Sequence, residues 1–223
     1  MTEAQRVRQR QGQRLSGLLQ ASPQHVQLAR WLSSQGPPEA WLAAGCVNQL
    51  VWNHLSGQPA TAHFKDWDIV YFDPDLRASS EARWRERLQA AFPNLTLDVK
   101  NQARVHLWFA ERFGAQAAIQ PLASIAEALQ TWPTTATATA ARWHQSRRHP
   151  SHWQQDRWEI LAPFGLDDLF MARVRPNPVR VSAAVYAAKT ARWQACWPML
   201  EILPFASAEA TSEPEPSPAH GPG

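Results

Sequence analysis

Hydrophobic and polar residues follow one another along this chain in two alternating patterns, one typical of helices and one typical of strands. Apolar residues three and four positions apart predict helices, and short apolar runs bounded by turn residues predict strands. We expect helices over 23–35, 47–55, 80–91, 102–114, 124–132, 164–170 and 182–194. We expect strands over 41–45, 64–73, 94–99, 135–139, 158–162 and 201–205. This order predicts an α+β fold in which helices flank a mixed sheet.

The two ends of the chain lack this pattern. Residues 1–20 are rich in Gln and Arg, and we expect them to form a flexible basic head, either frayed or a loose helix. Residues 207–223 are rich in Pro, Glu and Ser, a composition that predicts a disordered tail. A single folded domain is therefore expected over 21–206.

Composition narrows the class of protein. The chain has 223 residues, of which 44% are hydrophobic, enough for one sizeable core. It contains no apolar run long enough to cross a bilayer and no segment of signal-peptide type, so we expect a cytoplasmic protein without a membrane partner. The two cysteines, Cys46 and Cys196, and the scattered histidines form no pattern typical of a zinc site.

Two acidic residues stand at the start of the strand expected over 64–73, which reads FKDWDIVYFD. Asp66 and Asp68 are two positions apart, so they point to the same face of a strand, at a spacing of about 7 Å. Two carboxylates this close repel each other unless a cation lies between them. Mg²⁺ is such a cation, since it is commonly held by one or two carboxylates together with substrate phosphates.

A third acid lies in the next expected strand, in the segment TLDV. Asp98 has apolar neighbours on both sides, and an ionised carboxylate among buried residues is costly unless it is paired or bound to a metal. If this strand lies beside the previous one, Asp66, Asp68 and Asp98 converge. Three carboxylates can hold Mg²⁺ or Mn²⁺ for the in-line transfer of a nucleotidyl group from an NTP.

A glycine turn precedes both acidic strands, in the segment LAAGCVNQLVW. Gly45 stands where a strand meets a helix, so the backbone of Gly45, Cys46 and Asn48 can approach a phosphate at the helix N-terminus. Two of the residues that follow Asp98, Lys100 and Asn101, are candidates for further contacts. Lys100 is either a phosphate clamp or a solvated strand-end lysine, and Asn101 is either a nucleotide contact or a helix cap.

The order of these features resembles the nucleotidyltransferase fold shared with DNA polymerase β. AAGCV, DWDI and LDV match its glycine turn, its Asp-x-Asp strand and its third acidic strand. More closely, the chain resembles an uncharacterised bacterial family of nucleotidyltransferase-like proteins over about 24–205. The segments that carry this resemblance are GCVNQLVWNHLSG, KDWDIVYFD, DVKNQARVHLW, WPTTATA, APFGLDDLF and RPNP. The resemblance implies that Gly45 is the phosphate-side turn and that Asp66, Asp68 and Asp98 are the metal-binding, catalytic acids.

The same layout is similar to the glycine and Asp-x-Asp motifs of tRNA CCA-adding enzymes, with three departures. Ala44 replaces the first glycine, Asn48 replaces an arginine and Gln49 replaces an aspartate. These departures argue against a tRNA substrate.

The sequence therefore predicts a Mg²⁺- or Mn²⁺-dependent nucleotidyltransferase that moves an NMP from an NTP to a hydroxyl acceptor and releases pyrophosphate. A small molecule, a protein or an RNA end would serve as acceptor by the same chemistry. One alternative is a nucleotide-binding or regulatory module that keeps the fold without turnover. A weaker alternative is a nucleic-acid binder that uses the Arg-rich head, for which a net charge of +3 gives no firm support.

Overall fold

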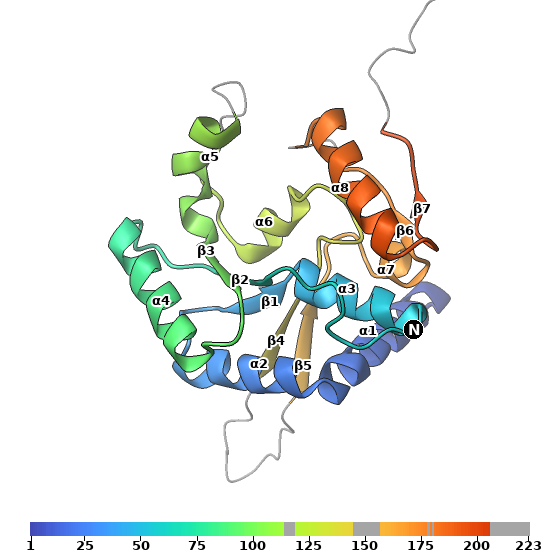
Figure 1. The fold of residues 1–223 in the computed structure, drawn as a ribbon, viewed down its shortest axis with the longest axis horizontal. Coiled ribbons are helices and arrows are strands. Elements are labelled where there is room, and N and C mark those ends of the chain that lie inside the picture. Colours follow the sequence, from blue (N-terminus) through green and yellow to red (C-terminus); the bar gives the residue numbers. More distant parts are fainter. Residues whose placement is uncertain (114–118, 145–156, 178, 180, 206–223) are drawn as a thin grey trace, which may run out of the picture.

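The computed structural model describes residues 1–113, 119–144, 157–177, 179 and 181–205 (Figure 1). Its helices are α1 (Glu3–Ala21), α2 (Pro23–Gln35), α3 (Gly45–Leu55), α4 (Ala78–Ala91), the short 3₁₀ turn η1 (Gln102–Arg104), α5 (Val105–Phe113), α6 (Ile125–Gln130), α7 (Asp167–Phe170) and α8 (Ala183–Cys196). Its strands are β1 (Trp41–Ala43), β2 (Trp67–Tyr71), β3 (Leu97–Asn101), β4 (Ala140–His144), β5 (Arg157–Leu161), β6 (Arg173–Val174) and β7 (Glu201–Ile202). The α+β class with a mixed sheet is confirmed.

The main sheet has five strands in the order β3-β2-β1-β4-β5. The β2–β3 pair is parallel, because helix α4 carries the chain back across the sheet between them, and the other pairs are antiparallel. Strands β6 and β7 form a separate small parallel pair. Helices α1 and α2 lie on one side of the sheet, and α5, α6 and α8 surround its other side (Figure 1).

The register of the three strands β1, β2 and β3 separates an apolar row from an acidic row. Leu42, Ile69 and Val99 are neighbours across the strands, and all three are fully buried in the main core. One position earlier on β2 and β3, Asp68 stands beside Asp98. Because side chains alternate across a strand, the acidic row faces away from the main core, toward α5, α6 and α8.

The N-terminal head differs from the expectation of a flexible segment over 1–20. It forms α1, which begins with a capping box between Thr2 and Gln5 and buries Leu15 and Leu19 completely. Leu18 packs beside them, while most of the arginines remain on the exposed side. This apolar stripe anchors the helix against α2, α3 and β5, so the folded unit includes the head.

The segment 135–139 and the tail 207–223 were also assigned a structure from the sequence. The strand expected over 135–139 is wrong, because Thr134 and Thr137 bond to each other in a turn and the strand β4 begins at Ala140. The tail predicted over 207–223 lies outside the described residues. Within the residues that the structure describes, no helix is long and apolar enough to span a bilayer.

Candidate active site

The three predicted acids line one cavity, of about 460 Å³, which we call the acid cavity. Asp68 and Asp98 are register partners on the parallel strands β2 and β3, and Asp66 directly precedes β2. The lining residues are Ala44, Gly45, Asn48, Gln49, Lys65, Asp66, Asp68, Asp98, Trp108, Trp132, Pro133, Thr137, Lys189, Arg192 and Trp193. The chain therefore brings together the carboxylates that the sequence separates by thirty residues.

The glycine turn touches the acids directly. The backbone N–H of Gly45, the first residue of α3, donates a hydrogen bond to Asp68 Oδ2 at 3.0 Å. A Cβ atom at position 45 would lie 3.1 Å from that oxygen and 3.1 Å from Gln49 Nε2. A side chain at position 45 would therefore press on the ends of the Asp68 and Gln49 side chains, which would have to move by a few tenths of an ångström.

The residue before this glycine has a strained backbone. Ala44 has φ 45° and ψ −122°, a conformation that L residues rarely adopt. Alanine thus stands here in a conformation that suits the glycine of related motifs. The turn keeps its geometry, and the alanine adds conformational strain beside the acid cavity.

Asp68 is buried beside two other carboxylates, Asp66 and Asp98. Burial raises the pKa of Asp68 to about 7, and the negative charges of Asp66 and Asp98 add to the rise. The Gly45 N–H and the positive charge of Lys189 act in the opposite direction without cancelling it. A cation beside Asp68 would favour its ionised form, so this environment suits a positively charged ligand.

The residues fit a divalent metal shared with a substrate better than a metal held by protein alone. Asp66 and Asp68 offer the hard oxygen ligands that Mg²⁺ prefers. Asp98 Oδ1, however, lies 3.1 Å from Lys100 Nζ. Among the described residues, no three acidic, His or Cys side chains form a ready metal site. A metal at Asp66 and Asp68 would complete its shell with water and phosphate oxygens.

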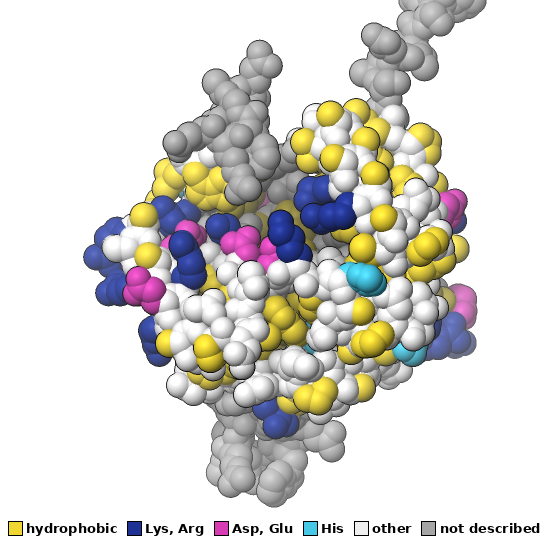
Figure 2. Space-filling view, in the orientation of Figure 1, with side chains coloured by type: hydrophobic (Ala, Val, Ile, Leu, Met, Phe, Trp, Pro, Cys, Tyr) yellow, Lys and Arg dark blue, Asp and Glu magenta, His cyan; other side chains and the backbone are white. Residues whose placement is uncertain are grey.

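Three cations line the acid cavity together with the acids. Lys65 precedes β2, and Lys189 and Arg192 come from α8. Figure 2 shows Lys and Arg side chains beside acidic ones in the hollow under the upper helices. Lys189 and Arg192 were not predicted from the sequence as site residues. Their spacing, with Trp193 next to Arg192, places all three on one face of a helix, which was the available signal.

Aromatic rings form part of the wall. Trp108 and Trp132 line the acid cavity and are partly exposed, so they offer flat surfaces on which a nucleobase can stack. Trp193 also lines the cavity, but it is 6% exposed and packs against Trp52 in the main core.

Two polar side chains in the acid cavity have unused hydrogen-bonding groups. Asn48 is 1% exposed, and neither its Nδ2 nor its Oδ1 has a partner among the described residues. The Oε1 of Gln49 is in the same state. Buried amides are nearly always satisfied by protein, water or ligand, so these groups are available to a water molecule or a ligand in the acid cavity. Asn48 was predicted from the sequence, and Gln49 was not predicted as a site residue.

Three other predicted residues have their side chains in different surroundings. Cys46 is buried and bonds to the carbonyls of Ala43 and Asp68, and burial raises its thiol pKa far above the usual range. Only its backbone adjoins the turn. Lys100 binds Asp98 and lines a second cavity.

Asn101 was expected to be either a nucleotide contact or a helix cap, and in the structure it is the cap of η1. Its Oδ1 accepts from the N–H groups of Asp73 and Ala103, and its Nδ2 donates to the carbonyls of Asp73 and Asp75. It is 1% exposed and is not among the lining residues of the acid cavity. Asn101 thus holds the loop after β2.

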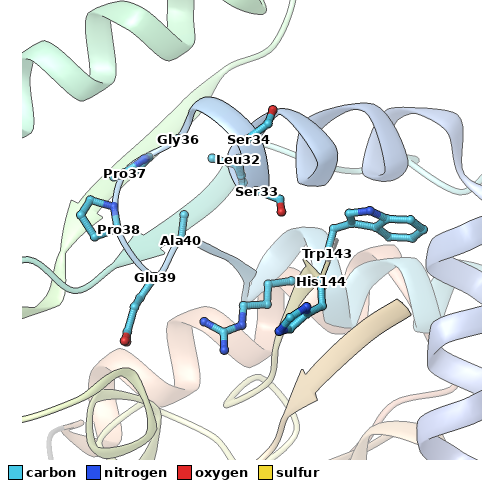
Figure 3. Close-up of a pocket in the computed structure, with 11 residues that line it drawn as sticks. Leu32, Ser33, Ser34, Gly36, Pro37, Pro38, Glu39, Ala40, Trp143 and His144 are labelled. Carbon is cyan, nitrogen blue, oxygen red and sulfur yellow. The ribbon is translucent and has the colours of Figure 1, made fainter. Parts of the chain in front are cut away.

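A larger cavity, of about 670 Å³, lies apart from the acids, between the segment 36–40 and the end of β4 (Figure 3). Its one acidic lining residue is Glu39. Its arginine, Arg142, is paired with Glu159 and stacked on Trp41. We therefore place the candidate site at the smaller acid cavity, where unpaired amides, acids and cations meet.

Comparisons with known proteins agree with this geometry. A family model described as nucleotidyltransferase matches residues 31–202, most of the chain. A solved structure, described as an NMR structure that reveals a CCA-adding enzyme head domain, is similar with a TM-score of 0.67 and 24% identity. That match covers 86% of this chain and 96% of the other, and at this identity it shows the fold alone. No curated protein matches the chain.

Proposed function

The chain belongs to the nucleotidyltransferase family, and from this premise we propose that it transfers an NMP from an NTP to a hydroxyl acceptor and releases pyrophosphate. We propose further that the reaction requires Mg²⁺ or Mn²⁺. The observation that carries the proposal is the acid cavity itself, in which Asp66, Asp68 and Asp98 meet the N-terminus of α3 and the unpaired amide of Asn48.

Each group of residues would have a distinct role. Asp66 and Asp68 would hold the divalent cation, which when bound neutralises charge on the phosphates. Lys65, Lys189 and Arg192 lie where they can bind the remaining phosphate oxygens. The partly exposed tryptophans of the acid cavity would stack on the base.

Two polar groups would complete the site. The amide of Asn48 would hydrogen-bond to the nucleotide, which satisfies groups that the protein leaves unpaired. Asp98 would accept the proton of the attacking hydroxyl through the carboxylate oxygen that Lys100 does not hold.

A nucleotide-binding module without turnover is the second candidate. The ion pair between Lys100 and Asp98 favours it, because it occupies one oxygen of the third acid. The clustering of costly like charges around Asp68 opposes it, since a binder of nucleotide alone needs fewer carboxylates.

The test incubates purified protein with each NTP, labelled at the α-phosphate, together with Mg²⁺ or Mn²⁺ and cell extract. Label transfer and pyrophosphate release are both followed. Asp68→Asn keeps an acceptor for the Gly45 N–H and removes the charge, so both signals should disappear. Glu86→Gln, an exposed charge removal on α4, is the matched control and should behave as wild type.

The two candidates give different results. Undiminished pyrophosphate release by Asp68→Asn would refute the role of the acid cavity. Metal-dependent stabilisation by an NTP without any pyrophosphate from the wild type would support the non-catalytic module instead.

A further inference from the structure

A second cavity, of about 270 Å³, adjoins the acid cavity on the far side of Asp98, and we call it the side chamber. Asp98, Trp108, Trp132, Pro133 and Lys189 line both spaces. Asp66 and Asp68 line only the acid cavity. Asp98 therefore stands at the boundary between two connected compartments.

The order of the strands fixes the direction of the reaction. Gly45 follows β1, Asp68 lies on β2 and Asp98 lies on β3, so the phosphate-binding turn and the side chamber are on opposite sides of Asp68. In an in-line displacement, the attacking oxygen and the leaving oxygen are on opposite sides of the phosphorus atom. A triphosphate seated at the α3 N-terminus therefore receives its nucleophile from the side of the chamber.

The walls of the side chamber differ from those of the acid cavity. Val105 and Phe109 from α5 face Val181 and Val185 near the start of α8. Asp98, Lys100, Gln102, Thr131 and Lys189 also line the chamber, so a ligand that packs on the apolar walls can still pair its hydroxyl groups there. The volume of about 270 Å³ lies just below the range for drug-sized ligands, about 300–1,000 Å³, and suits a body of one or two rings.

We propose that the side chamber is the acceptor site and that the acceptor is a small molecule with a hydroxyl group on a compact ring body, one face of which is apolar. This assignment rests on the proposed nucleotidyl transfer. The acceptor oxygen bonds to the α-phosphorus, and the bond from that phosphorus to the oxygen bridging to the β-phosphate breaks. Its electron pair leaves with pyrophosphate, and the hydroxyl proton passes to Asp98.

The experiment uses the full chain, α-labelled NTP, Mg²⁺, and cell extract divided into a small-molecule filtrate, a protein fraction and an RNA fraction. We expect label transfer to components of the filtrate, with equimolar pyrophosphate. Val185→Arg puts a charge on the apolar wall, and transfer per unit time should fall about 10-fold to 200-fold, the usual range for a lost apolar pocket contact.

The matched control is Met199→Arg, because Met199 and Val185 are both 39% exposed and Met199 lines neither cavity. This control should transfer label at the wild-type rate. Thermal unfolding of both variants checks folding, and titration with the NTP and Mg²⁺ measures nucleotide affinity apart from transfer. A fall in transfer that exceeds any change in nucleotide affinity supports an acceptor site at Val185.

The outcomes separate this assignment from the proposed function. Pyrophosphate release with label in the protein or RNA fraction overturns the acceptor class while nucleotidyl transfer stands. Equal transfer by Val185→Arg and Met199→Arg overturns the location in the side chamber. If the wild type releases no pyrophosphate with any fraction, the proposed function fails, and the acceptor assignment fails with it.

Discussion

The strained turn before α3 gives the sharpest prediction about stability. Ala44 has φ 45° and ψ −122°, and a non-glycine residue in such a sparsely populated region costs about 1–3 kcal/mol. Ala44→Gly removes this strain but increases the conformational entropy of the unfolded chain, which costs about 0.5–1 kcal/mol. The net expectation is a gain of about 1 kcal/mol in the free energy of unfolding.

Urea and thermal unfolding measure this gain, which corresponds to a rise in Tm of about 2–4 °C for a chain of this size. The control is Ala188→Gly, an exposed position in the middle of α8, where glycine should destabilise by about 0.5–1 kcal/mol. The two substitutions therefore have opposite expected signs. If Ala44→Gly destabilises as much as the control, the strain argument is refuted.

Three further predictions concern charge, hydrogen bonds and the core. The raised pKa of Asp68 means that the folded state binds more protons than the unfolded state between about pH 4 and about pH 7, so metal-free stability should fall as pH rises through that window. Asp68→Asn should flatten this part of the profile, measured by urea unfolding at several pH values; an unchanged slope would contradict it. Asn48→Ala should weaken NTP binding about tenfold with little change in Tm, whereas Asn101→Ala should lower stability by about 1–3 kcal/mol because it leaves buried backbone groups unpaired. Calorimetry measures the NTP affinity and thermal unfolding measures the stability. A loss of stability in Asn48→Ala together with a loss of NTP affinity in Asn101→Ala would contradict these roles. Leu19→Ala should destabilise the whole fold by about 2–5 kcal/mol, and a smaller loss in denaturant unfolding would mean that α1 is not part of the core.

The acidic half of the site was predictable because strand geometry is local. A period of two places Asp66 and Asp68 on one face, and a lone acid in the next strand points to Asp98. The cationic half was not predictable, because the face of α8 that carries Lys189 and Arg192 is defined only by what it packs against. The helical periodicity shows that Lys189 and Arg192 share a face of α8. It does not show which cavity that face lines.

The predictions that differ from the structure, at Asn101, at 135–139 and in the N-terminal head, differ for reasons that lie in the local sequence. Asn101 was assigned to both a nucleotide contact and a cap, and short polar side chains next to turns usually bond to nearby backbone. Alternating threonines over 135–139 indicated a strand, but Thr134 and Thr137 bond to each other and form a turn. In the head, the stripe of Leu15 and Leu19 was present, but Gln and Arg dominate the composition.

Lys189 and Arg192, the cations that α8 contributes to the acid cavity, lie near the end of the chain, and this position affects when the cavity is completed during synthesis. During translation the strands that carry the acids are complete well before Ala183 leaves the ribosome, and Lys189 and Arg192 arrive last. A nascent chain thus acquires its repulsive carboxylates first and the lysine and arginine that balance them only near the end of synthesis. The site that we propose for the nucleotide is therefore complete only when α8 has folded onto the sheet.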